Sequence, residues 1–257
     1  MGTPLSYAAL GSSFASGPGI DPIVDAAAMR SANNYPHVLA RALGADLTDL
    51  SVSGATTATI LDQPQVTMAG ARFAPQLDGV PPDAGLVTVT AGGNDLRYMT
   101  AMMFAGWNRV RPGGPAATML AADLPDGPPV PSAADVERTA AGLAAIVTRV
   151  RARAPRARIL LVDYLTVLGD DPAPEPFGDP LFRDIQSALE SAYVTAAARS
   201  GAELVAVSAI SRGHALGSAE PWIHPFTPTA AGAYSSLHPN AAGMAAVAAA
   251  IAWRLKN

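Results

Sequence analysis

The 257-residue sequence contains no cysteine, so neither a disulfide nor a metal site with thiolate ligands is available to it. Charged residues make up only 15 % of the chain, and the formal net charge is −4. No cluster of lysine and arginine marks out one face, and we therefore expect no nucleic-acid partner. The densest basic run, residues 149–158, ends a predicted helix, where cations complement the helix dipole.

Long hydrophobic runs are also missing. No apolar stretch is long enough to cross a bilayer, so we expect no transmembrane segment. Residues 1–4 do not look like a signal peptide. Together with the absence of cysteine, this favours a cytoplasmic protein, whereas a chain from which a signal had been removed would be secreted. Nothing in the sequence indicates an oligomeric state.

Apolar residues nevertheless make up 49 % of the sequence, which is enough for a sizeable core. The length, without an internal repeat or a linker, predicts one α/β domain over residues 1–257. Predicted strands alternate with predicted helices. The strands are expected at residues 7–10, 46–52, 86–90, 159–163 and 203–207. The helices are expected at residues 34–43, 94–104, 132–153, 181–199 and 239–255. Two stretches rich in glycine and proline, residues 106–131 and 169–180, predict long loops. The alternation predicts a parallel sheet with helices on both faces and ligands beyond the carboxyl ends of the strands.

Small and polar residues follow three of the predicted strands where each strand ends. They lie at residues 11–13, 53–55 and 92–95. A serine that directly follows a buried strand is one way to expose a nucleophile at the carboxyl edge of a sheet. A fourth polar block, residues 235–243, leads into the last predicted helix and contains His238, a candidate base.

These four blocks, in this order, resemble the SGNH branch of the GDSL esterases and lipases, of the actinobacterial type. The four residues that give the branch its name match Ser13, Gly54, Asn94 and His238. The resemblance implies a three-layer α/β/α, flavodoxin-like fold with a five-stranded parallel sheet in the order 2-1-3-4-5. It also implies a serine esterase or lipase that acts on small-molecule or lipid esters and uses no metal or cofactor.

The resemblance assigns a role to each matched residue. Ser13 would be the nucleophile that carries the acyl-enzyme, and His238 would be its base. The backbone N–H groups of Ser13 and Gly54 and the side-chain amide of Asn94 would form the oxyanion hole. Glycine permits close approach of the backbone, and an amide offers two donors. Taken singly, the same residues would be a turn glycine and a helix-capping asparagine.

Two positions depart from the family pattern. Ser12 occupies the place of the family's aspartate before the nucleophile, and Ser235 that of the aspartate three residues before the histidine. Either a distant acid such as Asp163 or Asp170 completes a triad, or the site is a Ser–His dyad. We favour a dyad in which a main-chain carbonyl near Ser235 orients His238, as in some relatives, because a carbonyl only accepts hydrogen bonds.

Apolar residues after the third block fit two interpretations. They could line an acyl pocket, or they could be the core face of a short helix. They are Met99, Met102, Met103, Phe104 and Trp107. Two other functions stay open as well. The same site could remove or transfer an acyl group on a sugar, or the altered Ser12 and Ser235 could mark a binding module with a degenerate site. Among the other three histidines, His224 is a weaker candidate base than His238, and we expect His37 and His214 to be structural.

Overall fold

Five parallel strands form the central sheet in a computed structural model that describes residues 3–257. In order across the sheet they are β4 (Asp46–Asp49), β1 (Ser6–Gly11), β7 (Leu86–Thr90), β8 (Arg158–Val162) and β9 (Glu203–Val205). In chain order this arrangement is 2-1-3-4-5, as the family resemblance implies, so the predicted α/β fold is confirmed. Among the described residues, no helix is both long and apolar enough to span a membrane.

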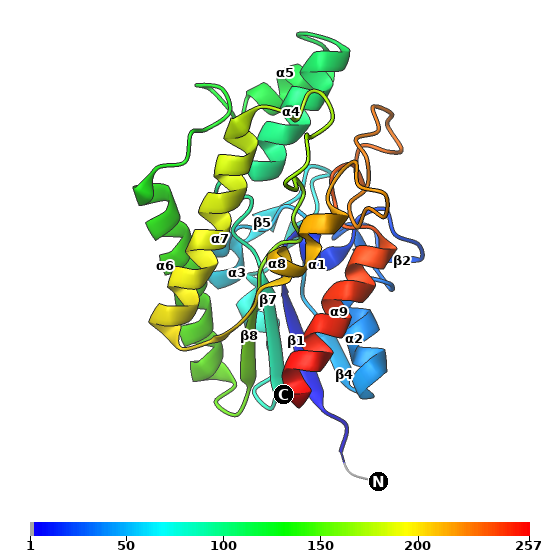
Figure 1. Ribbon diagram of the computed structural model, residues 1–257. Coiled ribbons are helices and arrows are strands. Elements are labelled where there is room, and N and C mark those ends of the chain that lie inside the picture. Colours follow the sequence, from blue (N-terminus) through cyan, green and yellow to red (C-terminus); the bar gives the residue numbers. More distant parts are fainter. Residues whose placement is uncertain (1–2) are drawn as a thin grey trace.

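Helices cover both faces of the sheet (Figure 1). One pair consists of α2 (Tyr35–Leu43) and α9 (Ala241–Lys256), and the other of α6 (Ala133–Arg153) and α7 (Pro180–Ser200). The remaining helices, all shorter than α9, are α1 (Ser13–Ser16), α3 (Thr57–Leu61), α4 (Tyr98–Val110), α5 (Pro115–Ala121) and α8 (Val207–Ser211), with the 3₁₀ turns η1 (Gln76–Gly79) and η2 (Arg212–His214). Two small hairpins join β2 (Ile23–Asp25) to β3 (Arg30–Ser31) and β5 (Gln65–Val66) to β6 (Arg72–Phe73).

The central strands are buried on both faces, which explains their nearly continuous apolar sequences. The polar exceptions are paired. The Thr88 hydroxyl lies 2.8 Å from the Tyr7 hydroxyl, and the Thr90 hydroxyl lies 2.9 Å from that of Tyr35. Because buried hydroxyls are costly without a partner, these pairs allow threonine to stay inside β7.

Hydrogen bonds between residues close in the sequence bound two of the predicted helices. Asn34 caps α2 by accepting a hydrogen bond from the His37 N–H, and Gly44, with φ of +61°, ends that helix. Ser132 and Asp135 form the capping box at the start of α6. These local hydrogen bonds are readable from sequence because both partners lie within one turn.

Other boundaries differ from the prediction. The helix expected at residues 94–104 begins at Tyr98, because a turn over residues 93–97 precedes it, and it extends to Val110. The expected loop at residues 106–131 contains α5. The last helix starts at Ala241 rather than Pro239, because the Asn240 side chain accepts from the Gly243 N–H and caps it.

Candidate active site

The first strand ends in a tight turn that carries Ser13. A Cβ atom on Gly11 would lie only 2.7 Å from the Thr90 carbonyl oxygen, so a side chain there would collide with β7. The Ser12 N–H donates to the same Thr90 oxygen at 2.9 Å, and α1 begins at the next residue. The turn therefore carries Ser13 to the carboxyl edge of the sheet, where ligands bind in this class of fold.

Ser13 and His238 meet at this edge although 225 residues separate them in the chain. The Ser13 Oγ lies 2.9 Å from the His238 Nε2. The Phe14 ring packs between two neighbours, with ring centroids 4.3 Å from Tyr164 and 5.6 Å from His238. A hydroxyl in contact with an imidazole nitrogen can transfer its proton to the ring, which is the geometry that a serine nucleophile requires.

The other ring nitrogen of His238 faces a main-chain oxygen. Its Nδ1 lies 2.8 Å from the Ser236 carbonyl oxygen, so Nδ1 carries the proton and Nε2 is free to accept one. The acceptor is thus not Ser235, the candidate from the family pattern. The Ser235 carbonyl instead accepts from the His238 backbone N–H at 3.1 Å. Leu237, with a left-handed φ of +62°, turns the chain between them.

Neither distant acid approaches His238. Asp163 is buried and accepts hydrogen bonds from the Ser208 N–H at 3.0 Å and the Ser208 hydroxyl at 2.6 Å. Burial raises the pKa of Asp163 to about 6. Asp170 is exposed and lies 3.9 Å from Arg212. The sequence alternative in which one of these acids completes a triad is therefore not the arrangement in this structure.

Burial has the opposite effect on the histidine. Burial is the main reason that the pKa of His238 is lowered to about 4. The nearby His224 also lowers this pKa, whereas the hydrogen bond to the Ser236 carbonyl raises it. His238 is therefore neutral at neutral pH and able to accept a proton. His224 does not contact Ser13. It is joined to the segment of His238 by backbone hydrogen bonds, from the His224 N–H to the His238 carbonyl at 2.8 Å and from the Leu237 N–H to the His224 carbonyl at 3.1 Å.

The three expected oxyanion donors come from three strand ends. Within residues 3–257, neither the Ser13 nor the Gly54 N–H donates to a protein acceptor. The Asn94 side chain donates one N–H to the Ala55 carbonyl at 2.8 Å, which leaves the second for another acceptor. Gly54 has φ of +84°, a conformation that favours glycine. Asp95, beside Asn94, is occupied by the Thr57 N–H and hydroxyl at the start of α3.

Ser12 makes a contact that sequence reasoning did not find. Its side chain is fully buried, and its Oγ lies 2.7 Å from the Tyr164 hydroxyl. The Gly93 N–H donates to the same Tyr164 oxygen at 3.2 Å. Tyr164 thus joins the nucleophile turn to the loop of Asn94. The signal that could have revealed Tyr164 is its position two residues after the end of β8, at the same edge of the sheet as the other three blocks.

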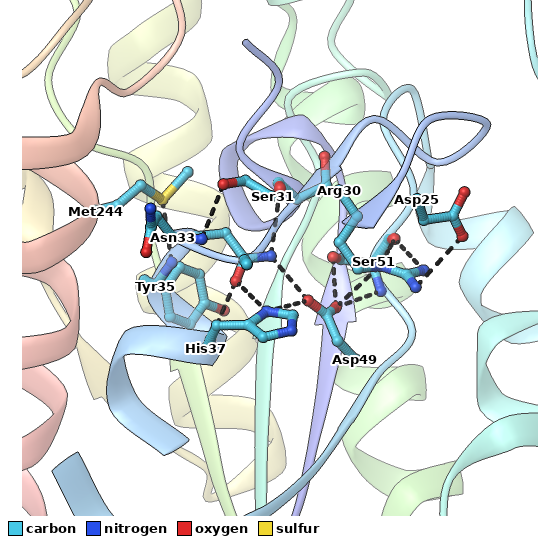
Figure 2. A network of polar contacts seen from close by, with 12 residues as sticks. Asp25, Arg30, Ser31, Asn33, Tyr35, His37, Asp49, Ser51 and Met244 are labelled. Atoms are coloured by element: carbon cyan, nitrogen blue, oxygen red, sulfur yellow. Dashed lines mark hydrogen bonds and ion pairs between the residues drawn. The ribbon is translucent and has the colours of Figure 1, made fainter. Parts of the chain in front are cut away.

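A network of polar side chains surrounds Asp49 and reaches the C-terminal end of α1 (Figure 2). Asp49, whose side chain is 5 % exposed, accepts from the Ser51 N–H and hydroxyl and lies 3.6 Å from Arg30. Asn34 donates one side-chain N–H to Asp49 at 2.8 Å and the other to the Ser16 carbonyl at 3.2 Å. The network connects β3, β4 and α2 with the end of α1. The strand β4 ends at Asp49, before the predicted residue 52.

The apolar residues of α4 divide between the two interpretations. Met99 and Met102 are buried in the core. Trp107 lies on another side, where its ring packs edge-on against Phe226 with centroids 5.7 Å apart. Gly106 also lies against Phe226, since a Cβ atom on this glycine would be 2.7 Å from the Phe226 ring. This side of α4 therefore faces the loop that precedes His238, whereas the two methionines are structural.

The other histidines have contacts of their own. The His37 ring lies 2.8 Å from the Asn34 side-chain oxygen and 3.4 Å from Asp49. The His214 ring stacks on Trp222 at a centroid distance of 3.9 Å. His238 alone of the four histidines contacts Ser13 in the part of the chain that the structure describes.

Comparisons with known proteins identify relatives of the chain. A family model described as the GDSL-like Lipase/Acylhydrolase family matches residues 9–246. "Lipase 2" from Streptomyces coelicolor is 35 % identical over 256 residues, which cover 93 % of this chain and 82 % of that protein. The extracellular lipase from Streptomyces rimosus is 25 % identical with a TM-score of 0.69, over 95 % of this chain and 97 % of the other. The phospholipase A1 from Streptomyces albidoflavus NA297 shares the fold, with 22 % identity, a TM-score of 0.70 and coverage of 99 % and 100 %.

Proposed function

The chain belongs to the GDSL-like lipase/acylhydrolase family and is a carboxylic ester hydrolase, and from this premise we propose that Ser13 is its nucleophile and His238 its general base. The observation that carries the proposal is the 2.9 Å contact between the Ser13 Oγ and the His238 Nε2. The buried hydroxyl of Ser12, directed at Tyr164, supports the choice of Ser13 over its neighbour.

The reaction proceeds through an acyl-enzyme. The Ser13 oxygen attacks the ester carbonyl carbon as His238 takes its proton, and the carbonyl electrons move onto oxygen. The tetrahedral intermediate then expels the alcohol, which takes the proton from His238, and the acyl group remains on Ser13. Water attacks this ester with His238 again as base. The carboxylic acid leaves, and Ser13 recovers its proton.

Three donors stabilise the oxyanion. They are the N–H groups of Ser13 and Gly54, which have no other acceptor in the described chain, and the second N–H of the Asn94 amide. Donors that are fixed before the reaction stabilise the developing charge without reorganisation, which is a large term in acyl transfer.

His238 and Ser13 form a catalytic dyad, and the Ser236 carbonyl takes the place of a third, carboxylate member. Its 2.8 Å contact with Nδ1 keeps the productive tautomer and supports the positive charge that forms on His238 during the reaction. A carbonyl has no negative charge, so it stabilises that imidazolium less than an aspartate does.

Lipid or other acyl esters are the proposed substrates, in line with the lipase relatives from Streptomyces. The test is hydrolysis of nitrophenyl esters of graded acyl length, with Ser13→Ala as the control. Hydrolysis by the native chain and its loss in Ser13→Ala supports the proposal, and a covalent phosphonate on Ser13 identifies the nucleophile directly. Hydrolysis that persists in Ser13→Ala would reject Ser13.

A further inference from the structure

Gly54 lies at the third position of a four-residue turn, residues 52–55. The Ala55 N–H donates to the Val52 carbonyl at 3.1 Å and closes the turn. With φ of +84° at Gly54, this is the conformation that a type II turn requires at its third residue. Type I and type II turns share the closing hydrogen bond and differ by a rotation of roughly half a turn of their central peptide. That hydrogen bond therefore leaves the direction of the central peptide undetermined.

The central peptide of this turn joins the Ser53 carbonyl to the Gly54 N–H, the proposed oxyanion donor. Because the two groups belong to one planar unit, the direction of the carbonyl sets the direction of the N–H. Gln65 fixes the carbonyl, since its Nε2 donates to the Ser53 oxygen at 2.8 Å. The same nitrogen would lie 3.4 Å from a Cβ atom on Gly54, so the amide packs directly against the turn.

We propose that Gln65 is a positioning residue for ester hydrolysis: by holding the Ser53 carbonyl, it keeps the Gly54 N–H directed into the oxyanion hole. The inference rests on the proposed function, because it requires Gly54 to be an oxyanion donor. Gln65 does not touch the substrate. A hydrogen bond to the carbonyl also polarises the peptide, which makes its N–H a stronger donor.

Stability gives little reason for an amide at this position. Gln65 is 6 % exposed, and its Oε1 is buried without a hydrogen-bond partner among residues 3–257. An unpaired buried oxygen destabilises the folded state, and an apolar chain of the same length would avoid that cost. The hydrogen bond that the Gln65 side chain does make is the one to Ser53. The amide thus contributes to the turn more than to the core.

Gln186 offers a matched control. It is another buried glutamine, 7 % exposed, but its Oε1 accepts hydrogen bonds from the Val167 and Leu168 N–H groups and from the Tyr98 hydroxyl. None of these bonds involves a proposed oxyanion donor. Gln186→Met should therefore lower Tm clearly and leave kcat per folded molecule unchanged. Gln65→Met loses one hydrogen bond and one unpaired oxygen, so it should leave Tm nearly unchanged and lower kcat.

The experiment compares Gln65→Met and Gln186→Met with the native chain for kcat, KM, Tm and inhibition by an alkylboronic acid. A boronate forms a tetrahedral adduct on serine and places an oxygen in the oxyanion hole. For Gln65→Met we expect kcat to fall about tenfold with little change in KM, since complete loss of an oxyanion donor costs about a hundredfold or more. Boronate affinity should fall by a similar factor. Tm should change by less than about 3 °C.

An unchanged kcat in Gln65→Met, a rise confined to KM, or unaltered boronate affinity would overturn the inference. So would an equal fall in kcat per folded molecule in Gln186→Met. If Gln65→Met does not fold, Gln65→Asn makes the same comparison, because it keeps an amide but is one carbon too short to reach Ser53. Failure of the proposed function has a different signature: Ser13→Ala would then remain active, whatever the glutamine variants do.

Discussion

Ser13 lies in a buried turn, and side chains from distant parts of the chain hold this turn in place. His238, in contrast, ends a loop with many exposed residues. The nucleophile turn receives the Gln76 amide, which bonds both the N–H and the carbonyl of Gly11, and the Tyr164 hydroxyl, which meets Ser12. The hydrogen bonds of the His238 loop, residues 224–238, come mainly from its own backbone and from the Ser236 hydroxyl, which donates to the Gly232 carbonyl at 2.8 Å. Among its side chains, Phe226 packs on Trp107 of α4.

This difference indicates that the two halves of the site are positioned by different means. The core of the sheet fixes Ser13, the proposed nucleophile, so changes in side chains far away in sequence should affect its position. Local backbone conformation fixes His238, the proposed base, so most side-chain changes in its loop should not.

Loss of the Ser13 hydroxyl or of the His238 imidazole should abolish most activity, although the two groups are held in place by different means. We expect Ser13→Ala and His238→Ala each to lower kcat by about three orders of magnitude or more, because each removes one partner of the proton transfer. Steady-state kinetics on a nitrophenyl ester measures this. Ser12→Ala is the control and should lose far less; an inactive Ser12→Ala beside an active Ser13→Ala would reverse the assignment.

On the side of Ser13, Asn94→Ala should lower kcat by roughly a hundredfold with little change in KM, because we propose that the amide donates to the charge that forms in the transition state. The same change removes the hydrogen bond to the Ala55 carbonyl. Circular dichroism separates the two effects. A variant that loses its fold would show that Asn94 is chiefly a structural link between loops.

On the base side, kcat/KM should depend on pH through His238. Burial lowers its pKa to about 4, and the neutral ring is the active form, so activity should be level above about pH 5 and half lost near pH 4. Because burial raises the pKa of Asp163 to about 6, protonation of that group favours the folded state as pH falls, and acid should not unfold the protein through it. Circular dichroism at each pH is the control. An acid limb near pH 6.5 would contradict the effect of burial on His238.

Tyr164→Phe should lower kcat about fivefold, the equivalent of one hydrogen bond of about 1 kcal/mol. The change removes the hydroxyl that joins Ser12 to the Gly93 N–H and leaves the ring that stacks on Phe14. If the pair acts as one unit, the double variant with Ser12→Ala should lose little more than either single variant. Fully additive losses would show that the two hydroxyls act independently.

The smallest effects should come from Ser235 and Asp163. The Ser235 hydroxyl donates to the Gly232 carbonyl at 3.3 Å, and Asp163 accepts hydrogen bonds from Ser208. Ser235→Ala and Asp163→Asn should therefore change kcat/KM by about twofold or less, because neither side chain contacts Ser13 or His238. A thousandfold fall in Asp163→Asn, with the fold intact, would restore a distant carboxylate to the mechanism.

The sequence was most informative where strands end. The positions of Ser13, Gly54 and Asn94 after three parallel strands predicted that they would share one edge, because parallel strands all end on the same side. The sheet order came from the family resemblance and is confirmed. Contacts that depend on backbone torsions were not predictable. No sequence pattern shows that Leu237 adopts φ of +62°, and without that angle Ser235 and the Ser236 carbonyl cannot be told apart as partners of His238.

Long-range side-chain contacts were missed for a related reason. Gln65 and Tyr164 each contact a loop from another part of the sequence. Their partners, Ser53 and Ser12, can be identified only once the β5–β6 hairpin and the strand ends are packed together. The short α5 and the two hairpins were missed because segments of two to seven residues have too little periodicity to stand out.

The main-chain oxygen opposite Nδ1 of His238 also has a consequence for how such a site changes through mutation. A triad aspartate can be deleted by one nucleotide change, but every amino acid carries a carbonyl, so no codon at position 236 encodes its absence. A mutational scan scored by activity should therefore identify Ser13 and His238 and find no side chain of comparable weight that orients His238. The positions that do matter for this acceptor should be those that constrain the local torsions, foremost Leu237, whose left-handed conformation directs the oxygen towards the ring.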